Sequence, residues 1–182
     1  TQEEKFEFPL SIDVLENGKI SRKEVWVTAK AKNDFVFDVT KNPELINANP
    51  EGLLLSDIKQ DKTPEQLYLQ YTTAKDLYSK YTAIEEAKDQ VSKNPFADKL
   101  YAAALKDKFY RNRLLALEGL PEDPKSFLAD VEKLAQNDEK NLVKGAAIGV
   151  LAKTKNPKYL PLFEKGINAI SNSVKGNSLS GI

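Results

Sequence analysis

The feature that most constrains the fold is a capping residue directly before a proline, which recurs about every 31 residues from residue 63 onward. Thr63-Pro64, Asn94-Pro95, Asp123-Pro124 and Asn156-Pro157 place their prolines 31, 29 and 33 residues apart. Thr, Asn and Asp side chains accept hydrogen bonds from the first N–H groups of a helix, and proline suits the first helical position. Each pair therefore predicts a helix start, and the spacing predicts a repeated helical hairpin.

A second register has the same period. Lys80, Arg113, Lys144 and Lys175 are 33, 31 and 31 residues apart, and small or apolar residues mostly follow each of them at the third, fourth and seventh positions. Those three positions share one helix face. We therefore expect about four helical hairpins, which resemble HEAT repeats, to stack into an α-solenoid over residues 61–182.

Residues 1–60 have the two-residue alternation of strands, with an Asn17-Gly18 turn suited to a tight hairpin. Three or four antiparallel strands with one apolar face need a cover, either from the helices that follow or from strands outside this chain. The predicted fold class is thus α+β, mostly α, with part of a β-sandwich in residues 1–60 and helical repeats in 61–182. The expected strands are 6–14, 25–29, 35–39 and, less regularly, 53–55.

Composition excludes several kinds of chemistry. The chain has no His and no Cys, so it cannot form a Ser-His-Asp triad, a Cys-His nucleophile, an H-E-x-x-H zinc site or a disulfide. Its 27 basic and 27 acidic residues cancel, and only 3 of the basic residues are arginine, which argues against a nucleic-acid partner. No apolar run is long enough to predict a membrane span.

Two acidic residues stand at the same distance from two of the repeated basic residues. Asp107 precedes Arg113 by six positions, and Asp138 precedes Lys144 by six. In HEAT-type repeats such a pattern forms a ladder between neighbouring second helices, which is the interpretation we favour over a clamp for a substrate carboxylate at Arg113. Arg111 lies outside the repeated register and is the candidate substrate-facing residue. No catalytic residue and no metal ligand is predicted.

Taken in order, the segments resemble one protein family. The strand segments and the passage into the first helix are similar to the late β-sandwich of zinc aminopeptidases of the aminopeptidase N type, peptidase family M-one, the gluzincins. The last helical segment resembles the HEAT-like repeats that end the bacterial members. The segments that carry this likeness are 8–10, 12–14, 17–18, 25–27, 35–37, 43–47, 53–55, 62–67 and 156–163.

The resemblance implies a non-catalytic role. In that family the zinc is bound upstream of the sandwich, in a thermolysin-like domain with H-E-x-x-H and a further Glu, and the C-terminal helices form a bowl over the active site. This chain would then be a lid and scaffold, with zinc in the parent enzyme only. Its partners would be the upstream catalytic domain of the same chain and the peptide substrate, in a bacterial cytoplasm or periplasm. Thr1 at the start and the uncharged segment 178–182 at the end lead us to expect a longer parent chain.

Two other functions are open to the same residues. The helical hairpins could form a stand-alone HEAT-like module for protein–protein interaction, with its concave face as the binding surface. A carbohydrate-binding β-sandwich is the weaker alternative, because Trp26, Tyr68, Tyr71 and a few other aromatic residues are all that is available and most of them fit cores.

Overall fold

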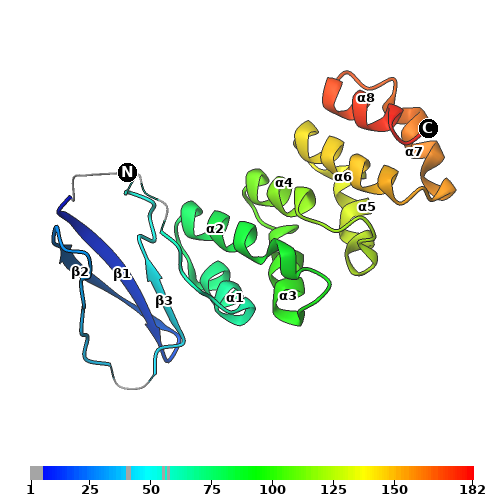
Figure 1. Cartoon of the computed structure of the whole chain (residues 1–182). Helices are drawn as coiled ribbons and strands as arrows, with labels where there is room; N and C mark the ends of the chain where they lie inside the picture. The colour runs from blue at the N-terminus through cyan, green and yellow to red at the C-terminus, as the bar shows by residue number, and fades with distance from the viewer. Residues whose placement is uncertain (1–5, 40–41, 55, 57) are drawn as a thin grey trace. The chain divides into compact units, whose positions relative to one another are not determined.

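The computed structural model describes residues 6–39, 42–54, 56 and 58–182, and it confirms an α+β fold that is mostly helical (Figure 1). The chain divides into two compact units, Thr1–Lys80 and Tyr81–Ile182. The elements are, in chain order, β1 (Phe8–Glu16), β2 (Lys19–Val27), β3 (Leu45–Ala48), α1 (Pro64–Thr73), α2 (Leu77–Ala87), the 3-10 turn η1 (Lys88–Gln90), α3 (Pro95–Ala104), α4 (Tyr110–Glu118), η2 (Lys125–Phe127), α5 (Leu128–Asn137), α6 (Asn141–Lys153), η3 (Pro157–Tyr159), α7 (Leu160–Gly166) and α8 (Asn172–Leu179).

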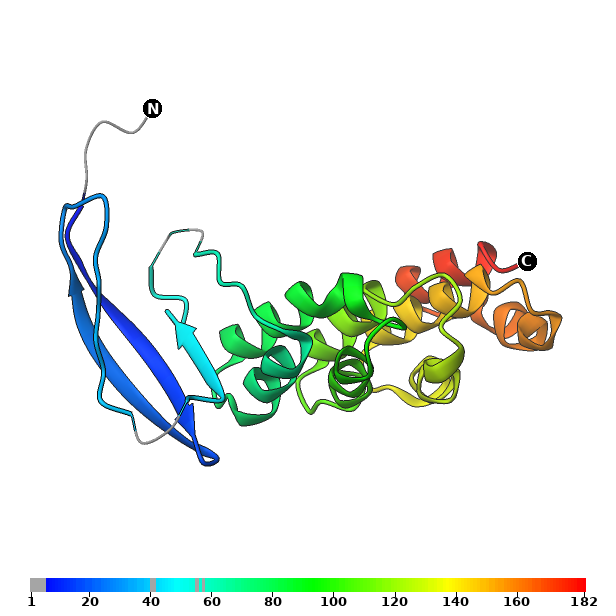
Figure 2. The ribbon, with the colours of Figure 1, turned by 60° about the horizontal axis from the view of Figure 1, so that its bottom comes forward.

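The first unit contains an antiparallel sheet in the order β2-β1-β3. Figure 2 shows the long β1–β2 hairpin in blue and the short β3 in cyan. Asn17 and Gly18 both have positive φ, 51° and 70°, which the two-residue hairpin turn requires. The predicted hairpin is therefore confirmed, and its register pairs Glu16 with Lys19 and Phe8 with Val27.

Two predicted strands do not form. Residues 35–39 are not a strand and join no ladder within the described part of the chain. Leu45–Ala48 is the segment that pairs with the second edge of β1. Leu53 and Leu54 also lie outside any strand, and Leu55 is outside the described residues. The Asn49 side chain instead hydrogen-bonds both the N–H and the carbonyl of Leu54, which holds this segment as a turn.

Helix α1 does not cover the strand face that the alternation marked as apolar. It faces the opposite side of the sheet, where Leu15 of β1 and Leu45 of β3 lie in register and are 1% and 4% exposed. On the predicted face, Ile12 and Val14 are buried, whereas Ile46, the partner of Val14, remains 49% exposed. Both faces of β1 are thus buried at the turn end of the strand, which a simple two-residue alternation does not indicate.

The predicted helix starts form in three of four places. Thr63 makes a complete capping box with Gln66, and Asn94 caps α3 ahead of Pro95. Asn156 also accepts an N–H and precedes proline, but it starts a 3-10 turn before α7. The prediction for Asp123 is wrong: its carboxylate pairs with Lys125, and α5 begins only at Leu128 after another 3-10 turn.

The repeated basic residues occupy equivalent positions. Lys80, Arg113, Lys144 and Lys175 are each the fourth residue of their helix, α2, α4, α6 and α8. In the second unit α3 contacts α4, α5 contacts α6, and α7 contacts α8, while α6 also contacts both α4 and α8. The solenoid of four hairpins stays a prediction, because α1 belongs to the first unit and α2 runs across the division between the units.

The core of the second unit is built from the predicted faces of these helices. Ala83, Ile84 and Ala87 are fully buried, and the equivalent residues of α4 and α6 are at most 2% exposed, except Leu120, which is half-buried. The last repeat differs, because Ser178 is buried but Leu179 and Ile182 are 63% and 65% exposed.

Helices α6 and α8 approach closely because α6 carries two glycines on the contact side. A Cβ atom on Gly145 would lie 2.9 Å from backbone atoms of Ser173, and one on Gly149 would lie 2.5 Å from the side-chain oxygen of Asn177. Small residues permit this backbone approach, which a larger side chain would prevent.

Candidate functional site

The second unit has a cavity of about 650 Å³ where two helix–helix connections meet, which we name the hairpin-loop cavity. It lies at the α3–α4 connection and the start of α4 on one side, and at α5 and the α5–α6 connection on the other. Three of the predicted residues, Asp107, Arg113 and Asp138, line it. The full lining is Leu105, Lys106, Asp107, Lys108, Phe109, Tyr110, Arg113, Asp130, Lys133, Leu134, Asn137, Asp138, Glu139 and Lys140.

A buried ion pair joins the two sides of the cavity. Arg113 donates from Nε to Asp138 Oδ2 at 2.7 Å and from Nη2 to Asp138 Oδ1 at 2.9 Å, which is a bidentate contact. Only 13% of the arginine side chain and 3% of the aspartate side chain are exposed. The remaining Nη1 donates to the carbonyl oxygens of Asp107 and Lys108, so the guanidinium also fixes the turn before α4.

The surroundings of this pair stabilise both charges. Burial raises the pKa of the Asp138 carboxyl, but hydrogen bonds from Arg113 and from the Lys140 N–H, with the positive charges of Arg113 and Lys144, outweigh it and lower the pKa. The hydrogen bond to Asp138 in turn raises the pKa of Arg113. Both groups are therefore charged at neutral pH, and the pair acts as a structural cross-link.

The other predicted residues have different positions. The Asp107 carboxylate accepts the Phe109 N–H at 2.8 Å, and Lys144 contributes charge near Asp138 without an ion pair of its own in the described chain. Arg111 is exposed and does not line the cavity, but its Cζ lies 5.7 Å from the centroid of the Tyr110 ring. The structure thus brings Asp107, Arg113 and Asp138 together and places Arg111 beside them.

Sequence reasoning missed the aromatic and lysine residues of the site. Tyr110 lies near two cations: Lys140 Nζ is 5.9 Å from its ring centroid, and Arg111 also contacts the ring. Phe109 packs edge-on against Tyr110 at 5.5 Å between centroids. Asp107 and Asp138 are 31 residues apart, so the repeat period could have indicated that the α3–α4 and α5–α6 connections are equivalent. No motif identifies the lysines.

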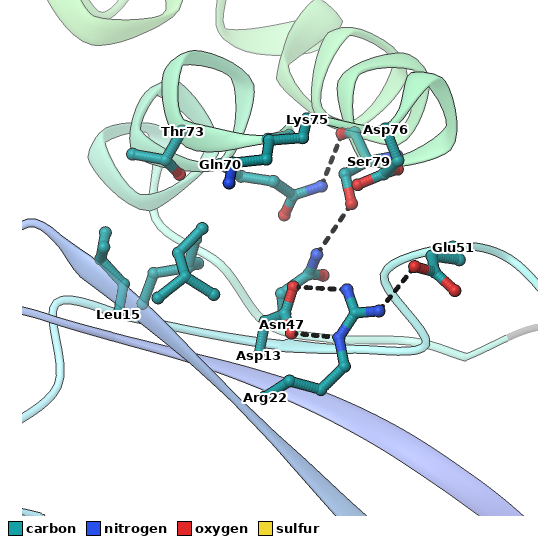
Figure 3. A pocket seen from close by; sticks show the side chains of 13 residues that line it. Asp13, Leu15, Arg22, Asn47, Glu51, Gln70, Thr73, Lys75, Asp76 and Ser79 are labelled. Atoms are coloured by element: carbon teal, nitrogen blue, oxygen red, sulfur yellow. Dashed lines mark hydrogen bonds and ion pairs between the residues drawn. The ribbon is translucent and has the colours of Figure 1, made fainter.

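The first unit has a smaller cavity of about 330 Å³ between the sheet and α1 (Figure 3). Arg22 of β2 contacts both oxygens of Asp13 on β1, at 2.8 and 3.0 Å, and also Glu51. The two carboxylates raise the pKa of this guanidinium. The hairpin turn could have predicted the Asp13–Arg22 pair, since a two-residue turn at residues 17–18 places them directly opposite.

Behind that ion pair is a buried hydrogen-bond network. Asn47 donates to Ser79 Oγ at 3.1 Å, Ser79 donates to the Pro50 carbonyl at 2.8 Å, and Gln70 donates to the Ser79 carbonyl at 2.8 Å. Lys62 Nζ donates to Asn47 and Gln70 at 2.8 and 2.6 Å. Figure 3 shows the Asn47, Gln70 and Ser79 side chains directed toward one another across the space between sheet and helix. They hold β3, the following loop and the two helices together, which is a structural function.

Within the described residues, no group of three or more acidic side chains is placed to hold a metal ion. In the same part of the chain, no helix combines the length and apolar character needed to cross a bilayer. The carbohydrate hypothesis relied on Trp26, which is 57% exposed, and on Tyr71, which is buried in α1.

No family model, curated protein or solved structure matches the chain.

Proposed function

We propose that this chain is a non-catalytic scaffold and lid from the C-terminal region of a zinc metallo-aminopeptidase, as its resemblance to the aminopeptidase N type implies. The parent would remove N-terminal residues from peptides, with its zinc bound by an upstream domain of the same chain. The 182 residues contain no His, so the H-E-x-x-H ligands of that zinc would come from outside them.

The observation that carries the proposal is the order of the elements. A short antiparallel sheet is followed by paired helices, which is the order that the resemblance implies for the end of the sandwich and the helical bowl. The partly exposed sheet face at Ile46 supports the same proposal, because an apolar sheet face is ordinarily covered by a second layer.

The most direct test is the reading frame that encodes Thr1. We expect an H-E-x-x-H sequence with a downstream Glu in the same frame, upstream of the sheet. The complete protein with zinc should hydrolyse aminoacyl arylamides, and the 182-residue chain with zinc should not. A reading frame without that motif would overturn the proposal, and so would aminopeptidase activity of the 182-residue chain alone.

A stand-alone HEAT-like interaction module is the second candidate. The hairpin-loop cavity favours it, because two helix–helix connections in the second unit join to form a recess with charged and aromatic walls. The reading frame separates the two candidates: an interaction module would carry no zinc-binding domain, whereas the aminopeptidase reading requires one.

A further inference from the structure

We propose that the hairpin-loop cavity binds an acidic peptide segment that presents one aromatic or aliphatic side chain between its carboxylates. The inference concerns a protein partner and is independent of the aminopeptidase proposal. It depends on two features of the cavity: three lysines that form no ion pair in the described chain, and an apolar floor.

The first feature is a group of three lysines that form no ion pair in the described part of the chain. Of the five cations that line the cavity, Arg113 and Lys106 are neutralised by Asp138 and Asp130. Lys108, Lys133 and Lys140 are exposed and form no ion pair within the described part of the chain.

The acidic residues of the lining leave a small excess of positive charge. Asp130 and Asp138 are paired, and the Asp107 side chain accepts the Phe109 N–H in its own turn. Glu139 is exposed and makes no ion pair in the described residues. Asp107 keeps its negative charge, so the lining has five cations and four carboxylates and a net charge of +1. A ligand that places carboxylates at the three lysines without an ion pair would complement this charge.

The second feature is the apolar floor. Leu105 is 1% exposed and Leu134 is 9% exposed, so their side chains close the bottom of the cavity. Phe109 and Tyr110 are half-buried beside them and present ring surface. An aromatic or aliphatic ligand side chain can bury its area here while neighbouring carboxylates reach the lysines, which is the usual arrangement of a small binding pocket.

The two helix starts at the cavity offer no further anion site. Helix α4 begins after Phe109 and α6 after Lys140. Asp107 already accepts the Phe109 N–H and Asp138 accepts the Lys140 N–H, so carboxylates of the chain itself lie at both helix N-termini. A ligand carboxylate would therefore bind through the lysines.

The same lining disfavours a nucleic acid. The net charge of +1 and the carboxylates of Asp107 and Glu139 leave no continuous positive strip for a run of phosphates. Arg111 contacts the Tyr110 ring and does not line the cavity. A peptide can place its carboxylates and an apolar side chain separately, which a phosphate backbone cannot.

The test uses the peptide Asp-Glu-Phe-Glu-Asp, labelled with fluorescein at its N-terminus and amidated at its C-terminus. Binding to the whole chain is measured by fluorescence anisotropy, with the Asn-Gln-Phe-Gln-Asn peptide and a labelled oligothymidylate in parallel. We expect the acidic peptide to bind at least about tenfold more tightly than either, and more weakly as salt increases. Because its N-terminus is blocked, the peptide cannot be an aminopeptidase substrate, and its failure to bind would leave the aminopeptidase proposal standing.

The variants locate the binding. Lys108→Glu with Lys133→Glu and Lys140→Glu should weaken binding at least about tenfold. The matched control reverses three exposed lysines of the second unit that do not line the cavity, Lys88, Lys153 and Lys165, and should retain most of the affinity. Glu139→Lys should tighten binding, and Tyr110→Ala should weaken it more than Tyr110→Phe.

Several results would overturn the inference. They are equal binding of the neutral peptide, equal or tighter binding of the oligothymidylate, an equal loss in the control variant, or no gain from Glu139→Lys. Circular dichroism of each variant checks that the fold is retained, and the gain expected from Glu139→Lys cannot come from unfolding.

Discussion

The two units stabilise an arginine in different ways. In the first unit Arg22 contacts Asp13 and Glu51 at the edge of a cavity, and 38% of its side chain is exposed. In the second unit Arg113 makes the same bidentate contact with Asp138, but only 13% of its side chain is exposed and the remaining donors reach backbone carbonyls. The hydrogen bonds of the two ion pairs are alike, so the difference in burial decides how much each pair contributes to the stability of its unit.

The sequence separations differ as well. Asp13 and Arg22 face each other across one hairpin turn, nine residues apart. Arg113 and Asp138 are 25 residues apart and join the connections of two successive helix pairs. The first pair reinforces a contact that the turn already fixes, whereas the second maintains a contact between repeats that no local geometry imposes.

The largest effect is expected from removing the buried arginine. Arg113→Ala leaves the Asp138 carboxylate 3% exposed in the parent structure and without its ion-pair partner, so we expect the second unit to lose about 3 kcal/mol. Urea denaturation followed by far-ultraviolet circular dichroism should show the loss, since six of the eight α-helices in the described part of the chain belong wholly to the second unit.

The matched control is Arg22→Ala in the first unit. We expect a loss of about 1 kcal/mol, because Asp13 and Glu51 can be hydrated at this more open site. Trp26 is the single tryptophan of the chain and lies in β2, so its fluorescence follows the first unit. Equal losses in the two variants would contradict the assigned difference between the pairs.

The second prediction tests close packing in the second unit. Gly145→Ala should cost about 2 kcal/mol, because the new Cβ would meet the Ser173 backbone and force α6 and α8 apart. Gly149→Ala is the matched control on the same helix: its Cβ would meet the Asn177 side chain, which can move. Thermal unfolding of both variants should show a clearly larger drop in Tm for Gly145→Ala.

Much of the secondary structure could be predicted from the sequence, for reasons that particular residues make clear. Thr63-Pro64 and Asn94-Pro95 encode helix starts locally, and Asn17-Gly18 encodes a turn, so neighbouring residues suffice. Residues 35–39 have strand alternation too, but they join no ladder in the described chain, and Leu45–Ala48 pairs with β1 instead. Both β2 and β3 are edge strands of the sheet, so the alternation alone does not decide which segment becomes a strand.

The candidate site shows the same limit. Asp107, Arg113 and Asp138 could be selected because they repeat, but the partner of Arg113 is Asp138 of the following connection, and Asp107 contributes a carbonyl oxygen instead. Lys133 and Lys140 reach the cavity through the packing of α5 and the α5–α6 connection. No spacing rule identifies them among 24 lysines.

A smaller effect is expected from acid. The folded pKa of Asp138 is lowered, so its contribution to stability is present above the unfolded value of 3.8 and is lost as the pH falls through the folded pKa. Glu132 behaves likewise, because hydrogen bonds from Lys158 and Tyr159 lower its pKa. Denaturation midpoints measured by circular dichroism should therefore fall below about pH 4. Asp138→Asn should reduce that dependence, and an unchanged slope would contradict the role of this carboxylate.

The smallest prediction is a gain in stability on α8, where the packing that restricts Gly145 is missing. A Cβ atom on Gly176 would meet nothing within 4 Å, and this glycine has an ordinary helical conformation. Gly176→Ala should stabilise the second unit by about 0.5–1 kcal/mol, because alanine loses less backbone entropy in a helix. Thermal unfolding should show a higher Tm for this variant and a lower one for Gly145→Ala. A fall in Tm for Gly176→Ala would mean that α8 packs against something on this side in solution, and the contrast between restricted and open helix faces would then have to be withdrawn.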